Sequence, residues 1–470
     1  MKKMPKVSIV LPLKNAERYL AEAMDGILGQ TFGDWELIIV CGRSEDQTWE
    51  MANSYKSEKI KILNQGDGNM ANAKNIGLRH AKGEYVIEAA GDDVWLPGML
   101  EASVGFMEAH PEVGASYSDY YQIDGRGREI GKVVCQNFDS ELPIADRINM
   151  GTLVMRRCCV DEVGGYDESL ETSEDSALKL ELARGFGLAR IPQPLIKYRV
   201  HPQQSTQARM TEHLRNYDLV KRKFRSRLDK PAVSVVVPAH NAERYITLCI
   251  DSIMGQFTPN FEIIVVDDGS TDGTKEICEG YGDQIRNFRR EQNLGIARTR
   301  NEGIESARGK WICFVSADDM LLPHALETFV RRAKEDAEDC FYFSSYHLIG
   351  EQGGAMGSNI VPEMPYEDLV IRSVQSAREN RMFLTYNVFA PTGLWRENPF
   401  DESYRFGEDL EHILRVMLVK RIKVRVIQQS LYLYRIHPQM ATQALGWQRI
   451  AENNRRTFQK INGLLGRRVL

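Results

Sequence analysis

The most constraining feature of this chain is that its sequence is repeated. Seven polar, acidic or turn-forming residues recur 226 positions later without a slip in register, namely Pro12, Asn15, Gln30, Asp46, Asn75, Asp92 and Asp93, which return as Pro238, Asn241, Gln256, Asp272, Asn301, Asp318 and Asp319. The register then drifts slightly, so that Glu174-Asp175 returns as Glu408-Asp409 and His201 returns as His437. A period of this length is far outside the range of solenoid repeats and predicts two copies of one domain. The repeated positions are polar rather than apolar, which indicates a shared functional site as well as a shared core.

The composition agrees with two globular domains. The 470 residues are 43% hydrophobic and 27% charged, which is typical of soluble proteins, and the length suits two or three domains. The net charge of −5 gives no reason to expect nucleic acid as a partner. No apolar run reaches the length of a membrane span, and the first residues lead into a strand pattern rather than a secretory signal. We therefore expect a cytoplasmic protein whose eight cysteines, which form no Cys-x-x-Cys unit, are reduced thiols.

Each copy alternates strand-like and helix-like segments. Short apolar runs at residues 7–11 and 233–237 are typical of strands buried on both faces, and second strands are expected at 36–40 and 262–266. Further strands at 85–87 and 311–315 lead into the paired aspartates. This alternation predicts an α/β fold, a doubly wound and mostly parallel sheet flanked by helices, with chemistry at the strand carboxyl ends. After the aspartates the pattern becomes more antiparallel, and a late helix begins at Glu174 and at Glu408.

The repeat also sets the expected domain boundaries. The first domain is expected at residues 1–205 and the second at 231–443, joined by a basic helical linker at 206–230 and followed by a helical tail at 444–470. Each copy closes with a Tyr-Arg-x-His-Pro motif, at 198–202 and at 434–438. Basic helices such as the linker and the tail are usually solvated or packed on a domain, and contact with the inner face of a membrane is the alternative.

In the second copy, one expected strand ends in the sequence Asp267-Asp268-Gly269-Ser270-Thr271-Asp272. Carboxylates just past a strand end can accept hydrogen bonds from a ribose hydroxyl or a base N–H, whereas turn formation followed by helix capping is the alternative. Together with the strand-Pro-x-x-Asn opening, the paired aspartates, the Glu-Asp pair and the final His, this ordered set resembles the inverting, family-2 type of nucleotide-diphospho-sugar glycosyltransferases with the GT-A fold. The resemblance covers nearly all of residues 5–205 and 231–440.

The resemblance implies a nucleotide pocket in each copy. In the second copy it would be lined by Pro238, Ala239, Glu243, Asp267, Asp268 and Arg300. In the first copy the partners or near-partners of these residues are Pro12, Leu13, Glu17, Asp46 and Lys74.

The resemblance also implies a metal site in each copy. Asp92-Asp93 and Asp318-Asp319 match the region in which the family holds a divalent cation on the donor's diphosphate, and carboxylate oxygens suit Mg²⁺ or Mn²⁺. The first aspartate of the family's Asp-x-Asp motif is replaced by Ala90 and Ser316. The expected direct ligands are Asp92 with His201 and Asp318 with His437, while Asp93 and Asp319 would contact the bound donor.

The Glu-Asp pairs would supply the catalytic bases. By resemblance, Asp175 and Asp409 take the proton of the acceptor hydroxyl, because a hydroxyl needs a positioned carboxylate to lose its proton near neutral pH. The alternative is purely structural, since acidic residues stabilise a helix N-terminus and Ser173 could act as the cap.

The leading hypothesis is a bifunctional, metal-dependent inverting glycosyltransferase that adds sugars from UDP-linked donors to an oligosaccharide or lipid-linked glycan of a bacterial surface polysaccharide. The two copies differ, since Cys41-Gly42-Arg43 stands where the second copy has Asp267-Asp268-Gly269. The alternative is therefore a single transferase in the second copy, with the first copy as a binding scaffold for nucleotide or glycan. A nucleotidyltransferase is disfavoured because no basic Gly-rich loop follows the first strand.

Overall fold

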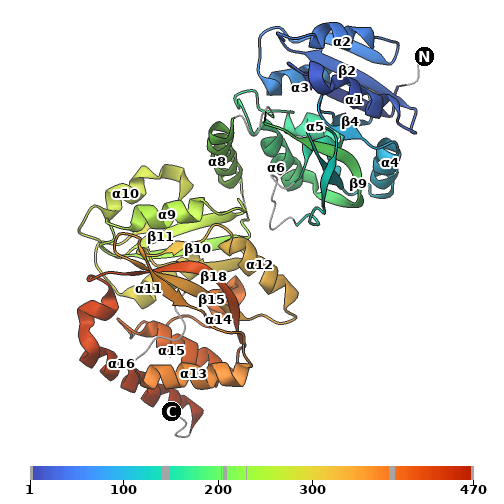
Figure 1. The fold of residues 1–470 in the computed structure, drawn as a ribbon. Coiled ribbons are helices and arrows are strands. Elements are labelled where there is room, and N and C mark those ends of the chain that lie inside the picture. Colours follow the sequence, from blue (N-terminus) through green and yellow to red (C-terminus); the bar gives the residue numbers. More distant parts are fainter. Residues whose placement is uncertain are drawn as a thin grey trace. The chain divides into compact units, whose positions relative to one another are not determined.

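The computed structural model describes residues 4–139, 148–202, 204, 209–228, 230–379 and 387–466. The chain divides into two compact units, Met1–Phe224 and Arg225–Leu470, which we call domain 1 and domain 2 (Figure 1). The expected boundary between residues 205 and 206 lies outside the described residues, as do residues 206–208 and 229 of the expected linker and 467–470 of the expected tail.

Domain 1 contains a nine-stranded sheet within its described residues, in the order β3-β2-β1-β4-β8-β6-β9-β5 with β7 beside β6. Its strands are β1 (Val7–Leu13), β2 (Trp35–Cys41), β3 (Ile60–Asn64), β4 (Tyr85–Glu88), β5 (Val94–Trp95), β6 (Ala115–Asp124), β7 (Glu129–Val133), β8 (Val154–Arg156) and β9 (Leu188–Val200). Its helices are α1 (Glu17–Leu28), α2 (Thr48–Ser54), α3 (Met70–His80), α4 (Met99–Ala109), η2 (Met150–Thr152), α5 (Arg157–Val163), α6 (Glu174–Phe186) and α8 (Met210–Ser226).

The sheet of domain 1 is mixed. Strands β1 to β4 run parallel to one another, as the sequence predicts. Strand β8 then joins antiparallel to β4, β6 pairs parallel with β9, and β5 pairs antiparallel with β9. The predicted α/β class is confirmed, with a parallel half that carries the strand ends of the expected nucleotide pocket and a mixed half that carries the closing motif.

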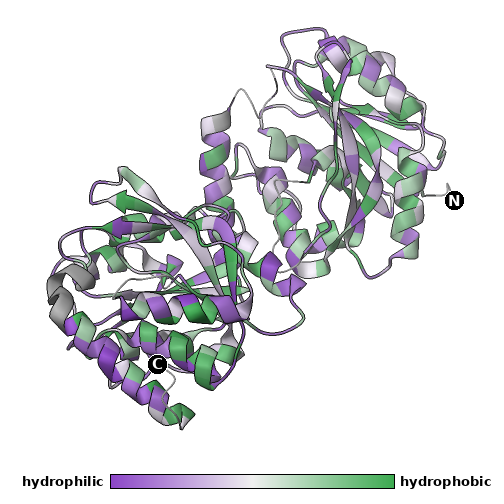
Figure 2. Ribbon diagram, turned by 60° about the horizontal axis from the view of Figure 1, so that its bottom comes forward, coloured by the Kyte–Doolittle hydropathy of each residue, from purple (hydrophilic) through white to green (hydrophobic). Residues whose placement is uncertain are grey.

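Helices cover both faces of this sheet. The alternate residues Val7, Ile9 and Leu11 of β1 contact α1 and α4 in one apolar cluster. On the other face, Ile38 and Val40 of β2 contact α3, and a further cluster joins β6 and β8 to α5 and α6. This is the pattern expected of strands whose successive side chains point to opposite, equally buried faces. In Figure 2 the central strands are mostly hydrophobic, whereas the helices carry both hydrophobic and hydrophilic residues.

Domain 2 repeats this architecture in its described residues, with the strand order β12-β11-β10-β13-β17-β15-β18-β14 and with β16 beside β15. Its strands are β10 (Val233–Ala239), β11 (Phe261–Asp267), β12 (Arg286–Arg289), β13 (Trp311–Phe314), β14 (Met320–Leu321), β15 (Phe341–Gly350), β16 (Ala355–Asn359), β17 (Phe389–Pro391) and β18 (Val424–Ile436). Its helices are α9 (Ile246–Met254), α10 (Thr274–Gly280), η3 (Gly282–Gln284), α11 (Ile296–Ser306), α12 (Ala325–Glu335), α13 (Tyr366–Arg378), α14 (Thr392–Glu397), α15 (Glu408–Leu414), the π-helical turn η4 (Arg415–Val419) and α16 (Ala441–Leu465).

The two basic helices pack on their own domains. In domain 1, Nδ1 of His213 on α8 lies 3.0 Å from Oγ of Ser173, the residue before α6. In domain 2, Asn453 on α16 donates to the carbonyl of Phe406, close to the start of α15. Each helix therefore supports the segment that leads into the expected catalytic aspartate. None of the described helices is both long and apolar enough to cross a membrane.

Candidate active sites

The paired aspartate and closing histidine meet at the end of a two-strand pairing. Because β5 and β9 are antiparallel, with Val94 opposite Lys197, the residues before β5 lie beside those that end β9. Asp92 Oδ2 is consequently 3.0 Å from His201 Nε2. The pairing of β14 with β18 in domain 2 places Asp318 Oδ2 at the same 3.0 Å from His437 Nε2.

Each Asp–His pair fits one edge of a divalent cation site. Ligand atoms about 2.1 Å from an octahedral cation lie about 3 Å apart when they are adjacent, which agrees with the observed oxygen–nitrogen separations. Within the described residues, no cluster of three His, Cys, Asp or Glu side chains forms a ready-made site. Mg²⁺ commonly keeps open positions for water and for a substrate's phosphates, so two protein ligands suit a cation that binds together with a diphosphate.

The second aspartate of each pair is tied to the closing strand. Asp93 is 3% exposed and accepts the backbone N–H of Arg199 at 2.9 Å, while Asp319 accepts that of Arg435 at 2.8 Å. Burial raises the pKa of both carboxyl groups, and the neighbouring Asp92 or Asp318 adds to that rise. Asp93 and Asp319, which are expected to contact the nucleotide-sugar donor, are thus already hydrogen-bonded to the backbone of their own domain.

The arginine of the closing motif holds the backbone of the expected metal ligand in each domain. Arg199 Nε donates to the carbonyl of Asp92 at 2.8 Å, and Arg435 Nε donates to that of Asp318 at 2.9 Å. Both arginine side chains are buried. The sequence showed these arginines within a repeated motif but assigned them no role.

The predicted pocket residues Pro12, Leu13, Pro238 and Ala239 end the first strand of each domain, beside the end of the second strand. The glutamates that follow bind the next loop: Glu17 accepts a backbone N–H of the turn after β2 at 2.9 Å, and Glu243 accepts that of Gly273 at 2.7 Å. Their own N–H groups donate to Asp46 and Asp272, both at 3.1 Å. Asp46 therefore corresponds to Asp272, and these four acids join the two loops that border the expected pocket.

The part of the expected nucleotide pocket at the end of the second strand differs between the domains. In domain 2, Asp267 is fully buried and accepts the N–H of Ser270 at 2.9 Å. Asp268 accepts the backbone N–H groups of Leu294 and Gly295, both at 2.9 Å, and pairs with Arg290 at 3.1 Å. Burial alone would raise the pKa of Asp268, but these donors outweigh it and lower that pKa.

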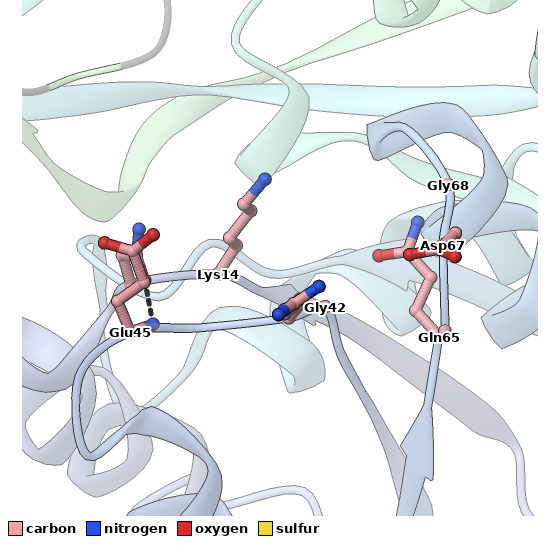
Figure 3. A pocket seen from close by; sticks show the side chains of 9 residues that line it. Lys14, Gly42, Glu45, Gln65, Asp67 and Gly68 are labelled. Atoms are coloured by element: carbon pink, nitrogen blue, oxygen red, sulfur yellow. Dashed lines mark hydrogen bonds between the residues drawn. The ribbon is translucent and has the colours of Figure 1, made fainter.

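In domain 1 the corresponding region is a cavity of about 340 Å³ (Figure 3), lined by Lys14, Asn15, Gly42, Arg43, Glu45, Gln65, Gly66, Asp67 and Gly68. Gly42 takes the place of Asp268, because Gly42 N–H donates to Leu13 O as Asp268 N–H donates to Ala239 O. The only acids lining the cavity among the described residues are Glu45 and Asp67, neither of which stands at the end of β2.

The catalytic-base candidates begin the late helices as predicted, at α6 and α15. The residues just before them, Ser173 and Gly407, both have a left-handed backbone, with φ of 66° and 69°. The alternative that Ser173 caps the helix is wrong, because its side chain makes no capping hydrogen bond and instead contacts His213.

In domain 1 the base candidate is paired with a lysine that the sequence analysis missed. Lys179 Nζ lies 3.2 Å from Asp175 Oδ2, one helical turn away, and donates to the carbonyl of Ile148 at 2.8 Å. The Lys179 side chain is 3% exposed and that of Asp175 is 28% exposed. Burial would raise the pKa of Asp175, but the ammonium groups of Lys179 and Lys74 outweigh it and hold that pKa below its usual range.

The predicted pocket cations Lys74 and Arg300 bind the glutamate before each base. Lys74 Nζ lies 2.7 Å from Glu174 Oε1 and 3.0 Å from Glu88 Oε1, and Arg300 bonds to Glu408. Each cation therefore fixes the start of the helix that carries the base, and the nucleotide contact expected of it remains a prediction.

The chain is similar in sequence to known glycosyltransferases. The sequence-family model described as Glycosyl transferase family 2 matches residues 8–159 and 234–388. An uncharacterized glycosyltransferase of Rickettsia felis is 27% identical over 474 residues, covering 86% of this chain and 75% of that protein. The putative glycosyltransferase EpsH of Bacillus subtilis is 30% identical over 223 residues, covering 45% of this chain and 62% of that protein.

Solved structures are also similar. Residues 1–349 of S. aureus TarS in complex with UDP-GlcNAc align at 21% identity with a TM-score of 0.41, covering 51% of this chain and 67% of that one. The mannosyltransferase PcManGT from Pyrobaculum calidifontis, in complex with GDP-Man and Mn²⁺, aligns at 20% identity with a TM-score of 0.37, covering 47% and 64%. Since the family model matches most of the chain and occurs in both halves, this protein belongs to glycosyl transferase family 2 and carries two tandem domains of that family.

Proposed function

We propose that this glycosyltransferase is bifunctional, metal-dependent and inverting, and that each domain moves a sugar from a nucleotide-diphospho-sugar, UDP-linked, to a growing glycan. The acceptor is an oligosaccharide or lipid-linked glycan of a bacterial surface polysaccharide. The observation that carries the proposal is that both domains keep the same Asp–His pair at 3.0 Å and the same Glu-Asp start of a helix. Two packing cores alone would not need either pair.

The proposed chemistry assigns one proton acceptor to each domain. Asp175 or Asp409 takes the proton of the acceptor hydroxyl while the hydroxyl oxygen bonds to the anomeric carbon of the sugar. The bond from that carbon to the diphosphate breaks on the opposite face, so the configuration inverts and a nucleoside diphosphate leaves. When bound by Asp92 and His201, or by Asp318 and His437, Mn²⁺ or Mg²⁺ supplies positive charge beside the leaving diphosphate.

The second candidate function is a single transferase in domain 2 with a binding scaffold in domain 1. Two observations favour it. Gly42 replaces the carboxylate of Asp268, and the carboxylate of the base candidate Asp175 is already ion-paired with Lys179 at 3.2 Å.

Substitution of one base at a time separates these functions. We expect Asp175→Asn and Asp409→Asn each to abolish a different transfer, because asparagine keeps the size of the side chain but cannot take a proton. The lost rate should be on the order of a hundred- to ten-thousand-fold. The assay is sugar transfer from a panel of nucleotide-sugars to glycan acceptors, with circular dichroism to confirm folding.

Asp25→Asn, at an exposed position of α1, is the matched control and should keep both transfers. If Asp175→Asn has no effect with any donor while Asp409→Asn removes all activity, domain 1 is a scaffold and the bifunctional proposal fails.

A further inference from the structure

At the ends of the second and third strands, the two domains carry different pairs of residues at corresponding positions. At the end of the third strand, Gln65 N–H donates to Cys41 O and Arg290 N–H donates to Asp267 O, both at 2.9 Å, so Gln65 and Arg290 are structural counterparts. Domain 2 thus pairs Asp268 with Arg290, where domain 1 has Gly42 and Gln65. A charged pair in one domain is replaced at both positions by an uncharged pair in the other.

Gln65 occupies the space that a side chain at position 42 would need. A Cβ atom on Gly42 would lie 2.8 Å from Oε1 of Gln65, and its next neighbour, the carbonyl oxygen of Leu13, would be 3.6 Å away. Figure 3 shows Gly42 between Glu45 and Gln65 in the cavity. The glycine therefore leaves room for the amide to reach the place held by the Asp268 carboxylate in domain 2.

The hydrogen bonds of Gln65 fix which amide atom faces this place. Its Nε2 donates to the carbonyl of Asn69 at 2.7 Å and lies 3.5 Å from Oδ1 of Asn72. A carbonyl oxygen can only accept, so the group beside Asn69 must be the amide nitrogen. Oε1 is left toward Gly42, where no described residue donates a hydrogen bond to it.

Asp268 offers the same chemistry in charged form. A carboxylate has about four acceptor positions, and Arg290, Leu294 and Gly295 occupy three of those on Asp268. One acceptor position remains for a base N–H. Each pocket thus presents one free acceptor position, on a negatively charged oxygen in domain 2 and on a neutral oxygen in domain 1.

We infer that Gln65 is the residue of domain 1 that recognises the nucleobase, by accepting a ring N–H with Oε1. This inference rests on the proposed donor site in domain 1. The bases that carry such an N–H are uracil, at N3, and guanine, at N1, whereas cytosine and adenine present an acceptor at that ring position and would face Oε1 with two lone pairs. Domain 1 therefore takes uridine or guanosine diphosphate-sugars and discriminates less strongly than domain 2, because hydrogen bonds to a charged acceptor are stronger.

The test is calorimetric titration of the full-length protein carrying Asp318→Ala, which disables the metal site of domain 2, with UDP, GDP, CDP and ADP in the presence of Mg²⁺. We expect UDP or GDP to bind more tightly than CDP and ADP. Adding Gln65→Ala should weaken the favoured nucleotide roughly three- to tenfold, which corresponds to one net hydrogen bond, and should reduce its preference over CDP. Gln193→Ala, an exposed glutamine of the same domain outside the pocket, is the control and should change neither.

A paired substitution sharpens this test. Gly42→Asp alone should weaken binding, because its Cβ displaces the Gln65 amide. Gly42→Asp combined with Gln65→Ala should regain the preference for UDP or GDP, because the acceptor then comes from the same strand end as in domain 2.

Unchanged affinity and preference in Gln65→Ala, tighter binding of CDP or ADP by the parent, or a double variant as weak as Gln65→Ala would each overturn this inference alone. Absence of any nucleotide binding by domain 1 would overturn the inference together with the bifunctional proposal.

Discussion

A single lysine makes the two catalytic-base candidates chemically different. Lys179 stands one turn after Asp175 on α6 and keeps that carboxylate ionised, whereas the corresponding position after Asp409 is Ile413, a buried apolar residue. An ammonium group close to a carboxylate lowers its pKa by stabilising the charged form. A base with a lower pKa stays ionised in more acidic solution but holds a proton less strongly.

Lys179→Met should therefore move the acid limb of the domain 1 pH–rate profile upward. Asp175 must be ionised to accept a proton, and without the ammonium group its pKa rises, so activity should be lost at a higher pH than in the parent. A nearby opposite charge is worth about one to three pH units. The measurement is the rate of domain 1 transfer against pH in an Asp409→Asn background.

Lys132→Met, at an exposed position of β7, provides the control and should leave the profile in place. An acid limb that stays where it was in Lys179→Met would show that Lys179 does not tune the base.

The site residues that recur in both copies could be predicted from the sequence, but the side chains that tune or replace them could not. Asp92, His201 and their counterparts could be found from the repeat alone, and the structure brings each pair together. Lys179 was missed because a lysine four residues after an aspartate is common on any helix. Gln65 was missed because only the register of three strands shows that it fills the space above Gly42.

At the scale of elements, one glycine in each domain sets how closely a helix packs on the first strand. These helices are α3, which carries Lys74, and α11, which carries Arg300. On α3, a Cβ at Gly77 would lie 2.2 Å from Cγ1 of Val10 on β1. On α11, a Cβ at Gly303 would lie 2.3 Å from Cγ1 of Val236 on β10. Real Cβ atoms do not approach this closely, so each helix rests directly on the first strand of its domain.

Gly303→Ala should destabilise domain 2 because the added methyl group must push α11 away from β10. Overpacking of this kind typically costs about 1–3 kcal/mol. The change should appear as a lower midpoint of thermal or urea unfolding, accompanied by a loss of domain 2 transfer as Arg300 shifts.

Val236→Ala in the same protein should restore part of the lost stability by making room. Gly105→Ala on α4, where an added Cβ would meet nothing within 4 Å, should be neutral or stabilising by up to about 1 kcal/mol. Equal effects of Gly303→Ala and Gly105→Ala would contradict the proposed close contact.

The elements themselves were largely predictable, but the pairing of half of them was not. Apolar runs identified three of the four parallel strands at the start of each domain but not β3 or β12, and the helix starts at Glu174 and Glu408 are where the sequence indicated. The long pairing of β6 with β9 joins two segments that have β7, β8, α5 and α6 between them in the sequence. Alternation within a strand indicates which side chains share a face but does not identify the neighbouring strand.

At the scale of the whole molecule, the two sites should depend on a divalent cation in the same way. Both have an Asp–His pair with the same 3.0 Å separation. Excess chelator should therefore abolish both transfers at once, and added Mn²⁺ or Mg²⁺ should restore them. The measurement is each transfer rate with and without chelator.

Single substitutions should remove the two transfer activities separately, whereas the chelator removes both. His201→Ala should impair only the transfer assigned to domain 1, and His437→Ala only that of domain 2. His324→Ala, a partly exposed histidine of domain 2, is the control. Full activity of either domain in excess chelator would remove the metal role from the pair in that domain.

The residues that surround Lys74 in domain 1 differ in kind from those that surround Arg300 in domain 2. Lys74 lies between Glu174 and Glu88, and Tyr166 donates to Glu88 at 2.8 Å. In domain 2 the same places hold apolar rings: Phe314 pairs with the first strand as Glu88 does, and Phe400 binds Asn301 as Tyr166 binds Asn75.

The copies can therefore no longer exchange residues one at a time. Glu88→Phe alone would leave a buried ammonium with one carboxylate fewer, and Phe314→Glu alone would remove the ring contacts of Phe314 with Trp395 and Phe400, each at a cost in stability. Gene conversion or recombination that transferred a short stretch between the two halves would tend to yield unstable proteins.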